Sequence, residues 1–206
     1  RMKPNVIARE VLVGKLAILF GQLGRLGLDF VACMAALERP YAGTVKIDGI
    51  DTRDDPRAIH ERLGYLPDFF GLYDELSVRR CLIFAARAHG LPSGKAEEAA
   101  ISTAQQVGLS DRLGDRAAEL SRGLRQRLAI GQAIVHTPKV LLLDEPASGL
   151  DPDARRDLSH LLLSLRDKGI TLIVSSHILS ELEDYASEML IMDRGHIAGG
   201  KQISVS

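Results

Sequence analysis

The sequence predicts an α/β protein with a largely parallel, buried sheet. Short runs of leucine and β-branched residues alternate along the chain with longer segments whose apolar residues have a helical spacing. Such alternation is typical of strands that are joined by crossover helices. Five runs are expected to be strands: residues 16–20, 43–48, 140–143, 171–175 and 189–193.

The segment from residue 140 to residue 175 predicts one strand–helix–strand unit. Between its two strands, apolar residues recur every three or four positions, which predicts a helix over 153–168 with one apolar face. Gly169 follows this helix and is a typical C-terminal cap. The two strands of such a unit run parallel in one sheet. The apolar face consists of Leu158, Leu161, Leu162 and Leu165.

A different pattern occupies residues 77–136. Helical segments follow one another there without a convincing strand, and glycines interrupt them. We therefore expect one domain over 1–206, whose α/β core is formed by 1–68 and 136–206. An all-helical subdomain of about 69–135 is expected to be inserted into that core.

The composition is typical of a globular protein. Hydrophobic residues make up 46% of the 206 residues, and 26 basic side chains against 27 acidic ones give a formal net charge of −1. No global field attracts nucleic acid, so we expect no nucleic-acid partner. The two cysteines, Cys33 and Cys81, are too few for a disulfide framework and suit a reducing compartment. No apolar run approaches the ~20 residues that cross a bilayer.

Two carboxylates end the apolar run Val140-Leu-Leu-Leu. Asp144 and Glu145 are expected at the carboxyl edge of the sheet, where open α/β folds bind ligands. In nucleotide hydrolases the first acid of such a pair holds Mg²⁺ and the second can polarise the attacking water. Acidic residues at strand ends are also common without any function, so the pair alone leaves both interpretations open.

Three further motifs accompany this pair in a fixed order. Leu120-Ser-Arg-Gly-Leu-Arg-Gln-Arg127 precedes it, Ser148-Gly-Leu-Asp151 follows it, and Ser175-Ser-His177 ends the next expected strand. Together they resemble the ATP-binding cassette of ABC transporters. Residues 121–127 resemble the signature, usually Leu-Ser-Gly-Gly-Gln, and the acidic pair resembles Walker B. The segment 148–151 resembles the D-loop.

The resemblance extends from about residue 14 to residue 200. Residues 65–73 are similar to the Q-loop region of exporter-type cassettes, with Asp68 in place of the usual glutamine. A RecA-like P-loop NTPase core with an inserted helical subdomain, the ABC ATPase fold, is implied. The family's N-terminal β strands are missing, and the chain begins with arginine and stops in Ser204-Val-Ser206, so we expect a fragment of a longer protein.

The resemblance also implies a function and a partner set. ATP and Mg²⁺ are the expected cofactors, transmembrane permease subunits and a second cassette subunit are the expected partners, and the cytoplasmic face of the membrane is the expected location. Glu145 and His177 would be catalytic, and Asp144 would hold the metal. Ser121 and Gly123 would face the γ-phosphate bound by the opposite subunit, and Asp151 would also bind nucleotide.

Each of these residues has a plainer interpretation as well. Ser121 and Asp151 can be ordinary helix N-caps, and Asp151 stands before Pro152, which is a typical helix start. A cap and a ligand role are compatible for both. His177 can be a buried core imidazole.

The phosphate-binding loop departs from the family pattern. A P-loop needs Gly-x4-Gly-Lys-Ser/Thr after a strand, so that backbone amides and a lysine hold the phosphates. Here Gly27 stands where the lysine belongs and Leu28 where the hydroxyl belongs. A lost unit charge about 4 Å from a phosphate removes on the order of 4 kcal/mol, roughly a thousandfold in affinity. The nucleotide-binding candidates in this loop are Gly21, Gly24, Arg25 and Gly27.

Three interpretations follow from this departure. The chain is an ATP-hydrolysing cassette, or a degenerate cassette that completes the ATP site of an intact partner, or a dinucleotide-binding protein with Asp48 or Asp51 as the ribose acid. The third interpretation requires a Gly-x-Gly-x2-Gly motif, whereas the glycines of this loop have a different spacing. It also leaves the signature-like segment unexplained. Retention of Glu145 and His177 favours an active ancestor or a local reading-frame slip, since codons for residues 28–33, read one base later, can spell Ser-Thr-Leu-Leu-Arg-Ala.

Overall fold

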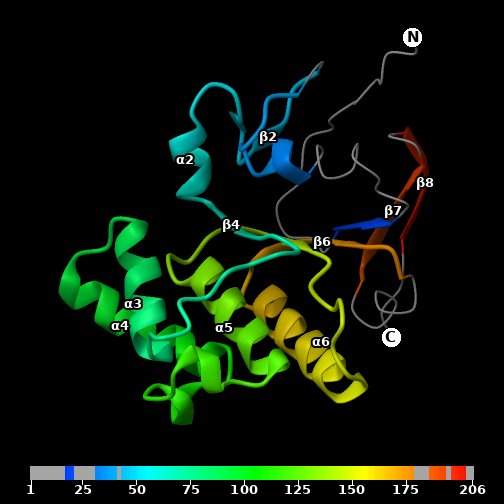
Figure 1. Ribbon diagram of the computed structural model, residues 1–206. Coiled ribbons are helices and arrows are strands. Elements are labelled where there is room, and N and C mark those ends of the chain that lie inside the picture. The colour runs from blue at the N-terminus through cyan, green and yellow to red at the C-terminus, as the bar shows by residue number, and fades with distance from the viewer. Residues whose placement is uncertain (1–16, 21–30, 41–42, 179–185, 194–195, 203–206) are drawn as a thin grey trace.

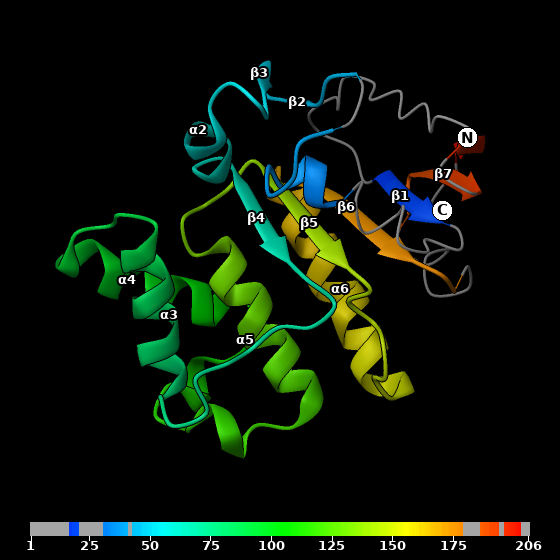
Figure 2. The ribbon, with the colours of Figure 1, turned by 45° about the horizontal axis from the view of Figure 1, so that its top comes forward.

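The computed structural model describes residues 17–20, 31–40, 43–178, 186–193 and 196–202. The predicted α/β architecture is confirmed: five parallel strands and one antiparallel edge strand form one sheet in the order β4-β5-β6-β1-β7-β8 (Figures 1 and 2). The strands are β1 (Ala17–Phe20), β4 (Leu63–Leu66), β5 (Val140–Asp144), β6 (Thr171–Ser176), β7 (Glu188–Asp193) and β8 (His196–Gln202).

Four of the five expected strands lie in this sheet, as β1, β5, β6 and β7. The expected strand over 43–48 is wrong. Only Lys46–Ile47 (β2) is extended there, and it pairs antiparallel with Ile50–Asp51 (β3) in a separate two-stranded sheet. Asp48 and Gly49 both have positive φ, 51° and 79°, so an Asp-Gly turn folds the chain back into a tight hairpin.

The described α-helices are α2 to α6, residues 31–34 are also helical, and two short 3-10 helices cover Ser110–Arg112 and Ala117–Glu119. No strand occurs between β4 and β5, a stretch that the structure describes throughout, as the helical pattern predicts. The division of the chain into core and helical subdomain stays a prediction. The helices are α2 (Pro56–His60), α3 (Val78–Ala88), α4 (Ser93–Gln106), α5 (Arg122–Ile134) and α6 (Pro152–Asp167).

Strand β5 is buried on both faces of the sheet, which explains its unbroken apolar run. Leu141 and Leu143 join the apolar cluster formed with α3, α5 and α6. Val140 and Leu142 point the other way, into a cluster with Ile47 of the hairpin and Ile59 of α2. Figure 1 accordingly shows α5 and α6 on one side of the sheet and α2 with β2 on the other.

The predicted strand–helix–strand unit is confirmed by β5, α6 and β6. The two strands are adjacent and parallel, with Val140 opposite Thr171 and Asp144 opposite Ser175. Helix α6 begins and ends one residue earlier than expected, and Gly169 has the positive φ of 91° that ends such a helix. The four leucines of its predicted apolar face are buried in the cluster beneath the sheet.

Gly64 lets β4 lie directly against α5. A Cβ atom at this position would be 2.2 Å from the carbonyl oxygen of Ala133 and 3.0 Å from Cδ1 of Leu141. Any larger residue would therefore force the helix and the strand apart.

None of the helices in the described ranges is both long and apolar enough to traverse a lipid bilayer.

Candidate functional site

Asp144 lies at the carboxyl end of β5 and is held there from the next strand. Its side chain is buried, and its Oδ1 accepts a hydrogen bond from the hydroxyl of Ser175 in β6. Burial raises the pKa of Asp144, the Ser175 hydrogen bond acts in the opposite direction, and the negative charge of Asp68 raises the pKa further. The second carboxylate oxygen accepts no hydrogen bond from the described residues, so the donor set suits a hard cation such as Mg²⁺.

Glu145 turns the chain sharply out of the sheet. Its φ of 48° is left-handed, a conformation that is uncommon for a residue with a side chain. The N–H of Glu145 donates to the carbonyl oxygen of Ser175 at 3.1 Å and to the Ser175 hydroxyl oxygen at 3.2 Å. Ser175 therefore holds both carboxylate residues: it contacts the side chain of Asp144 and the backbone N–H of Glu145.

His177 lies beside Glu145 at the same edge. Its Nδ1 is 2.9 Å from Oε1 of Glu145, and its side chain is 59% exposed against 18% for Glu145. The alternative of a buried core imidazole is therefore wrong. Burial raises the pKa of Glu145, and the hydrogen bond and charge of His177 oppose that increase.

Asp68 reaches this edge from β4, two residues after that strand ends. Its charge contributes to the raised pKa of both Asp144 and Glu145, so it lies within electrostatic reach of the pair. The structure thus brings Asp68, Asp144, Glu145 and His177 to the carboxyl ends of three neighbouring parallel strands.

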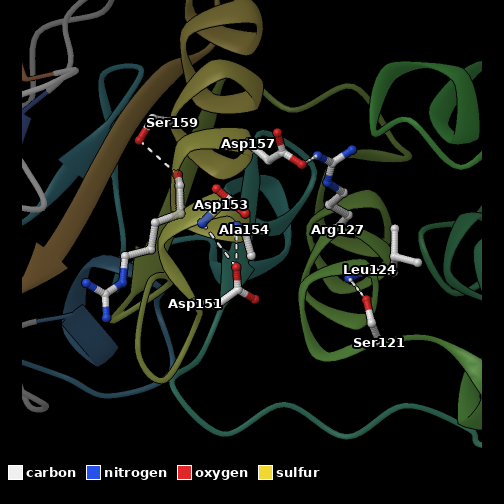
Figure 3. A network of polar contacts seen from close by, with 9 residues as sticks. Ser121, Leu124, Arg127, Asp151, Asp153, Ala154, Asp157 and Ser159 are labelled. Carbon is white, nitrogen blue, oxygen red and sulfur yellow. Dashed lines mark hydrogen bonds and ion pairs between the residues drawn. The ribbon is translucent and has the colours of Figure 1, made fainter.

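A second group lies where α5 and α6 begin. Ser121 is the N-cap of α5, and its hydroxyl accepts a hydrogen bond from the N–H of Leu124 at 3.4 Å. Asp151 is the N-cap of α6, and its Oδ1 accepts from the N–H groups of Asp153 and Ala154 at 3.1 and 2.9 Å (Figure 3). These backbone N–H donors hold the pKa of Asp151 below its usual range. Both cap predictions are confirmed.

The two caps line one pocket of about 210 Å³. A Cβ at Gly123 would be 3.1 Å from the Cβ of Ala154, so the starts of the two helices lie close together. Arg127 crosses the gap from α5 to α6 and forms an ion pair with Asp157 at 2.6 Å, as Figure 3 shows. The structure therefore brings Ser121, Gly123 and Asp151 to one place, while their role in nucleotide binding stays a prediction.

Comparison with known proteins now places the chain. A family model described as "ABC transporter" matches residues 29–148, more than half of the chain. The chain belongs to the ABC transporter family. The glutamine transport ATP-binding protein GlnQ of Escherichia coli (strain K12) is 30% identical over 198 residues, 93% of this chain and 82% of GlnQ.

Two other relatives of this ABC protein are also named as ATP-binding proteins, one of a resistance system and one of a transport system. The linearmycin resistance ATP-binding protein LnrL of Bacillus subtilis (strain 168) is 29% identical over 86% of this chain and 58% of LnrL. The bacitracin transport ATP-binding protein BcrA of Enterococcus faecalis is 32% identical over 97% of this chain and 64% of BcrA. The chain thus spans less than two thirds of the length of both proteins.

Solved structures agree with the ABC ATPase fold. The structure of an ATP-binding subunit of an ABC transporter has a TM-score of 0.79 at 27% identity, over 96% of this chain and 84% of that one. The dimeric post-hydrolysis structure of the ATP-binding cassette MJ0796, bound to ADP and Pi, has a TM-score of 0.82 at 20% identity, over 96% and 89%. At that identity the second likeness concerns the fold alone.

Parts of the ABC site fall outside the described residues. Gly21, Gly24, Arg25 and Gly27 lie there, so their role in nucleotide binding stays a prediction from the sequence.

The two acids that the dinucleotide alternative would need for the ribose are both engaged in ion pairs. Asp48 pairs with Lys139 at 2.7 Å and Asp51 with Arg53 at 2.9 Å, which holds the pKa of Asp51 at about 2.

The sequence analysis missed two residues that contact the ABC motifs. Ser175 was expected only as the end of a strand, and the available signal was the parallel register, which sets it opposite Asp144. Arg122 was treated as one letter of the signature, although its side chain reaches the D-loop. No sequence rule predicts that contact, because it depends on how α5 approaches β5.

Proposed function

We propose that this chain is the subunit of an ABC transporter that binds and hydrolyses ATP to power transport. The observation that carries the proposal is the arrangement of Asp144, Glu145 and His177, which Ser175 fixes at the carboxyl edge of the sheet. Phosphoryl transfer needs little covalent chemistry from a protein, so positioned charges of this kind account for most of the catalysis.

Glu145 is the group that orients and deprotonates the attacking water. Its partial burial raises its pKa and makes its carboxylate a stronger base than an exposed glutamate. Asp144 would hold Mg²⁺ directly or through water. When bound, that ion neutralises the charge of the phosphates.

His177 contacts the γ-phosphate from the outer side of Glu145. When its Nδ1–H donates to Glu145, its Nε2 can donate to a phosphate oxygen only in the imidazolium form. Two anions, the Glu145 carboxylate and the phosphate, would then stabilise that cation. The His177 side chain is 59% exposed, so a nucleotide can approach it.

The pocket at the starts of α5 and α6 serves the nucleotide of a second cassette subunit. Helix N-termini present unpaired N–H groups and a positive dipole end, which attract phosphate. Ser121 and Gly123 supply such groups on α5, and Asp151 lies across the pocket on α6. A head-to-tail dimer would therefore place ATP between the P-loop region of one subunit and the signature of the other.

Transmembrane permease subunits dock beside the Asp68 loop, so the chain is peripheral at the cytoplasmic face of the membrane. A cavity of about 420 Å³ lies there between β4, α5 and the Asp68 loop, which is the segment 67–71 that follows β4. Phe69 and Leu37 line it and are 92% and 59% exposed, which is unusual for large apolar side chains. A change in the bound nucleotide would alter the position of Asp68, and this loop would transmit that change to the membrane partner.

A second candidate is a degenerate cassette that binds ATP weakly and completes the site of an intact partner. Gly27 and Leu28, in place of the P-loop lysine and hydroxyl, favour it. The signature pocket would still function in that case, because Ser121 and Gly123 belong to the partner's ATP site.

Equilibrium binding of Mg-ATP by calorimetry separates the two candidates. The chain is compared with a variant that carries Gly27→Lys and Leu28→Ser, and with Gly94→Lys in α4 as a matched control, which adds a charge at an open position. Both candidates predict micromolar binding by the double variant and no gain in the control, so the affinity of the unchanged chain separates them: a degenerate cassette would bind about a thousandfold more weakly than the double variant. A double variant that still fails to bind would contradict the proposed function.

Micromolar binding by the unchanged chain supports hydrolysis without a P-loop lysine and removes the case for a degenerate cassette. Weak binding by the unchanged chain, restored by the double variant, favours the degenerate cassette for the chain as it stands.

A further inference from the structure

Arg122 is the first residue of α5, at a position where the ABC signature usually has glycine. Its side chain leaves the helix and reaches the loop that follows β5. The Nη2 group donates a hydrogen bond to the carbonyl oxygen of Ser148 at 3.0 Å. The guanidinium group also lies against Gly149, because a Cβ built on that residue would be 2.4 to 2.6 Å from three guanidinium atoms.

The loop that Arg122 contacts is exposed between two buried anchors. Ala147 and Leu150 are buried, and Ser148 and Gly149 between them are exposed. Within the loop, the Ser148 N–H donates to the Glu145 carbonyl at 3.0 Å, and the Leu150 N–H donates to the Ala147 carbonyl at 3.2 Å. Gly149 has a φ of 66°, so the loop bulges outward at the point where the guanidinium covers it.

We propose that Arg122 is a positioning residue that fixes the Ser148–Gly149 turn on the start of α5 and thereby fixes the backbone of Glu145. The contacts form a continuous path. Arg122 holds the Ser148 carbonyl, the Ser148 N–H holds the Glu145 carbonyl, and the Glu145 side chain contacts His177. The signature serves one ATP site of a dimer and Glu145 the other, so Arg122 connects the two sites within one subunit. That last step rests on the proposed function, whereas the fixing of the turn does not.

The chemistry of arginine suits this position. Its planar group can donate to a carbonyl and lie flat against a glycine at the same time, which the signature glycine of other cassettes cannot do. In the described part of the chain, Arg122 donates to a neutral carbonyl and forms no ion pair with a carboxylate. The contact is therefore insensitive to protonation of acidic side chains.

Amide hydrogen exchange measured by NMR on the full chain tests the proposal without nucleotide. Arg122→Ala is compared with Arg122→Lys, which keeps a donor, and with Arg112→Ala as a matched control. Arg112 is a half-exposed arginine that pairs with Asp115 at 3.2 Å, away from this loop. We expect Arg122→Ala to speed exchange at Ser148 and Leu150 about fivefold and to shift the amide resonance of Glu145.

Arg122→Lys is expected to restore part of the protection, and Arg112→Ala to leave it unchanged. Unchanged exchange at Ser148 and Leu150 in Arg122→Ala would overturn the proposal. An equal increase at the buried amides of Leu141 and Leu142 would overturn it too, because it would show global destabilisation. Failure of ATP binding would contradict the proposed function and leave this result standing.

Discussion

Ser175 and Asp144 face each other across two parallel strands and share a buried hydrogen bond. The register of β5 and β6 sets them opposite each other, and the hydroxyl of Ser175 donates to Oδ1 of Asp144. The same hydroxyl oxygen accepts the N–H of Glu145. One small side chain thus orients the residue proposed to hold Mg²⁺ and the residue proposed to act on water.

Removal of this hydroxyl should destabilise the protein more than removal of an ordinary one. Ser175→Ala leaves a buried carboxylate oxygen without its donor, so we expect a loss of about 2 kcal/mol in the free energy of unfolding. Ser164→Ala is the matched control, since its hydroxyl donates only to the carbonyl of Leu161 within α6. Urea unfolding at pH 7 measures both, and equal losses would show that the Asp144 contact is not special.

Glu145→Gln should remove hydrolysis and keep binding. In the variant that carries Gly27→Lys and Leu28→Ser, we expect at least about a hundredfold lower rate of ATP hydrolysis, because an amide cannot accept the proton of water. Mg-ATP affinity measured by calorimetry should change by less than about threefold. A rate that survives the substitution would assign the base to another residue.

The stacked pair His89 and His136 should make stability depend on pH. The ring centroids are 3.6 Å apart with planes 7° apart, and Nε2 of His136 lies 3.2 Å from the carbonyl oxygen of Leu63. Burial, followed by the charge of His89, lowers the pKa of His136 to about 4, and burial, followed by the charge of His60, lowers the pKa of His89. The folded protein therefore holds both rings neutral in a range where the unfolded chain binds protons.

The sign follows from that difference. The contribution of His136 is fully present above its unfolded pKa of about 6.5 and is lost as the pH falls toward 4. We expect the free energy of unfolding to fall by about 2 kcal/mol more in the unchanged protein than in His136→Gln between pH 7 and pH 4. His160→Gln, at an exposed position on α6, is the control and should follow the unchanged protein. Parallel curves for His136→Gln and the unchanged protein would refute this account.

Gly64→Ala should be strongly destabilising although it adds only a methyl group. The new Cβ would overlap the carbonyl oxygen of Ala133, a backbone atom that cannot move alone, so we expect a loss of about 3 kcal/mol in the free energy of unfolding. Gly94→Ala in α4 has nothing within 4 Å and should be neutral or slightly stabilising. Thermal unfolding of the two variants side by side checks the contrast.

The sequence predicted those parts of the fold that follow from periodicity and caps. The apolar run of β5, the leucine stripe of α6 and the Asp151-Pro152 start each had one strong local signal. Strand β4 was missed because it is four residues long and contains Gly64. That glycine is needed for the close contact with α5 and does not favour a strand by itself. The 43–48 strand was wrong because turn chemistry at Asp48-Gly49 overrode a short β-rich run.

The site was predictable to the extent that its residues end strands or begin helices. Asp144, Glu145 and His177 follow neighbouring strands, and parallel topology alone brings such residues together. Ser175 and Arg122 could not be found in this way, since their contacts depend on strand register and helix approach. The left-handed backbone of Glu145 was equally invisible, because the position holds neither glycine nor asparagine, the residues that usually adopt a positive φ.

The close contact at Gly64 provides a point about which α5 can tilt. The helix is 13 residues long, so about 20 Å separate its Ser121 end from its other end, near which Ala133 presses on β4. With that end held against the sheet, a tilt of only about 5° would carry the Ser121 end through more than about 1 Å, a distance comparable to the tolerance of a hydrogen bond. The absence of one methyl group at position 64 thus determines how far a small tilt of this helix moves its Ser121 end, which is the end proposed to bind phosphate.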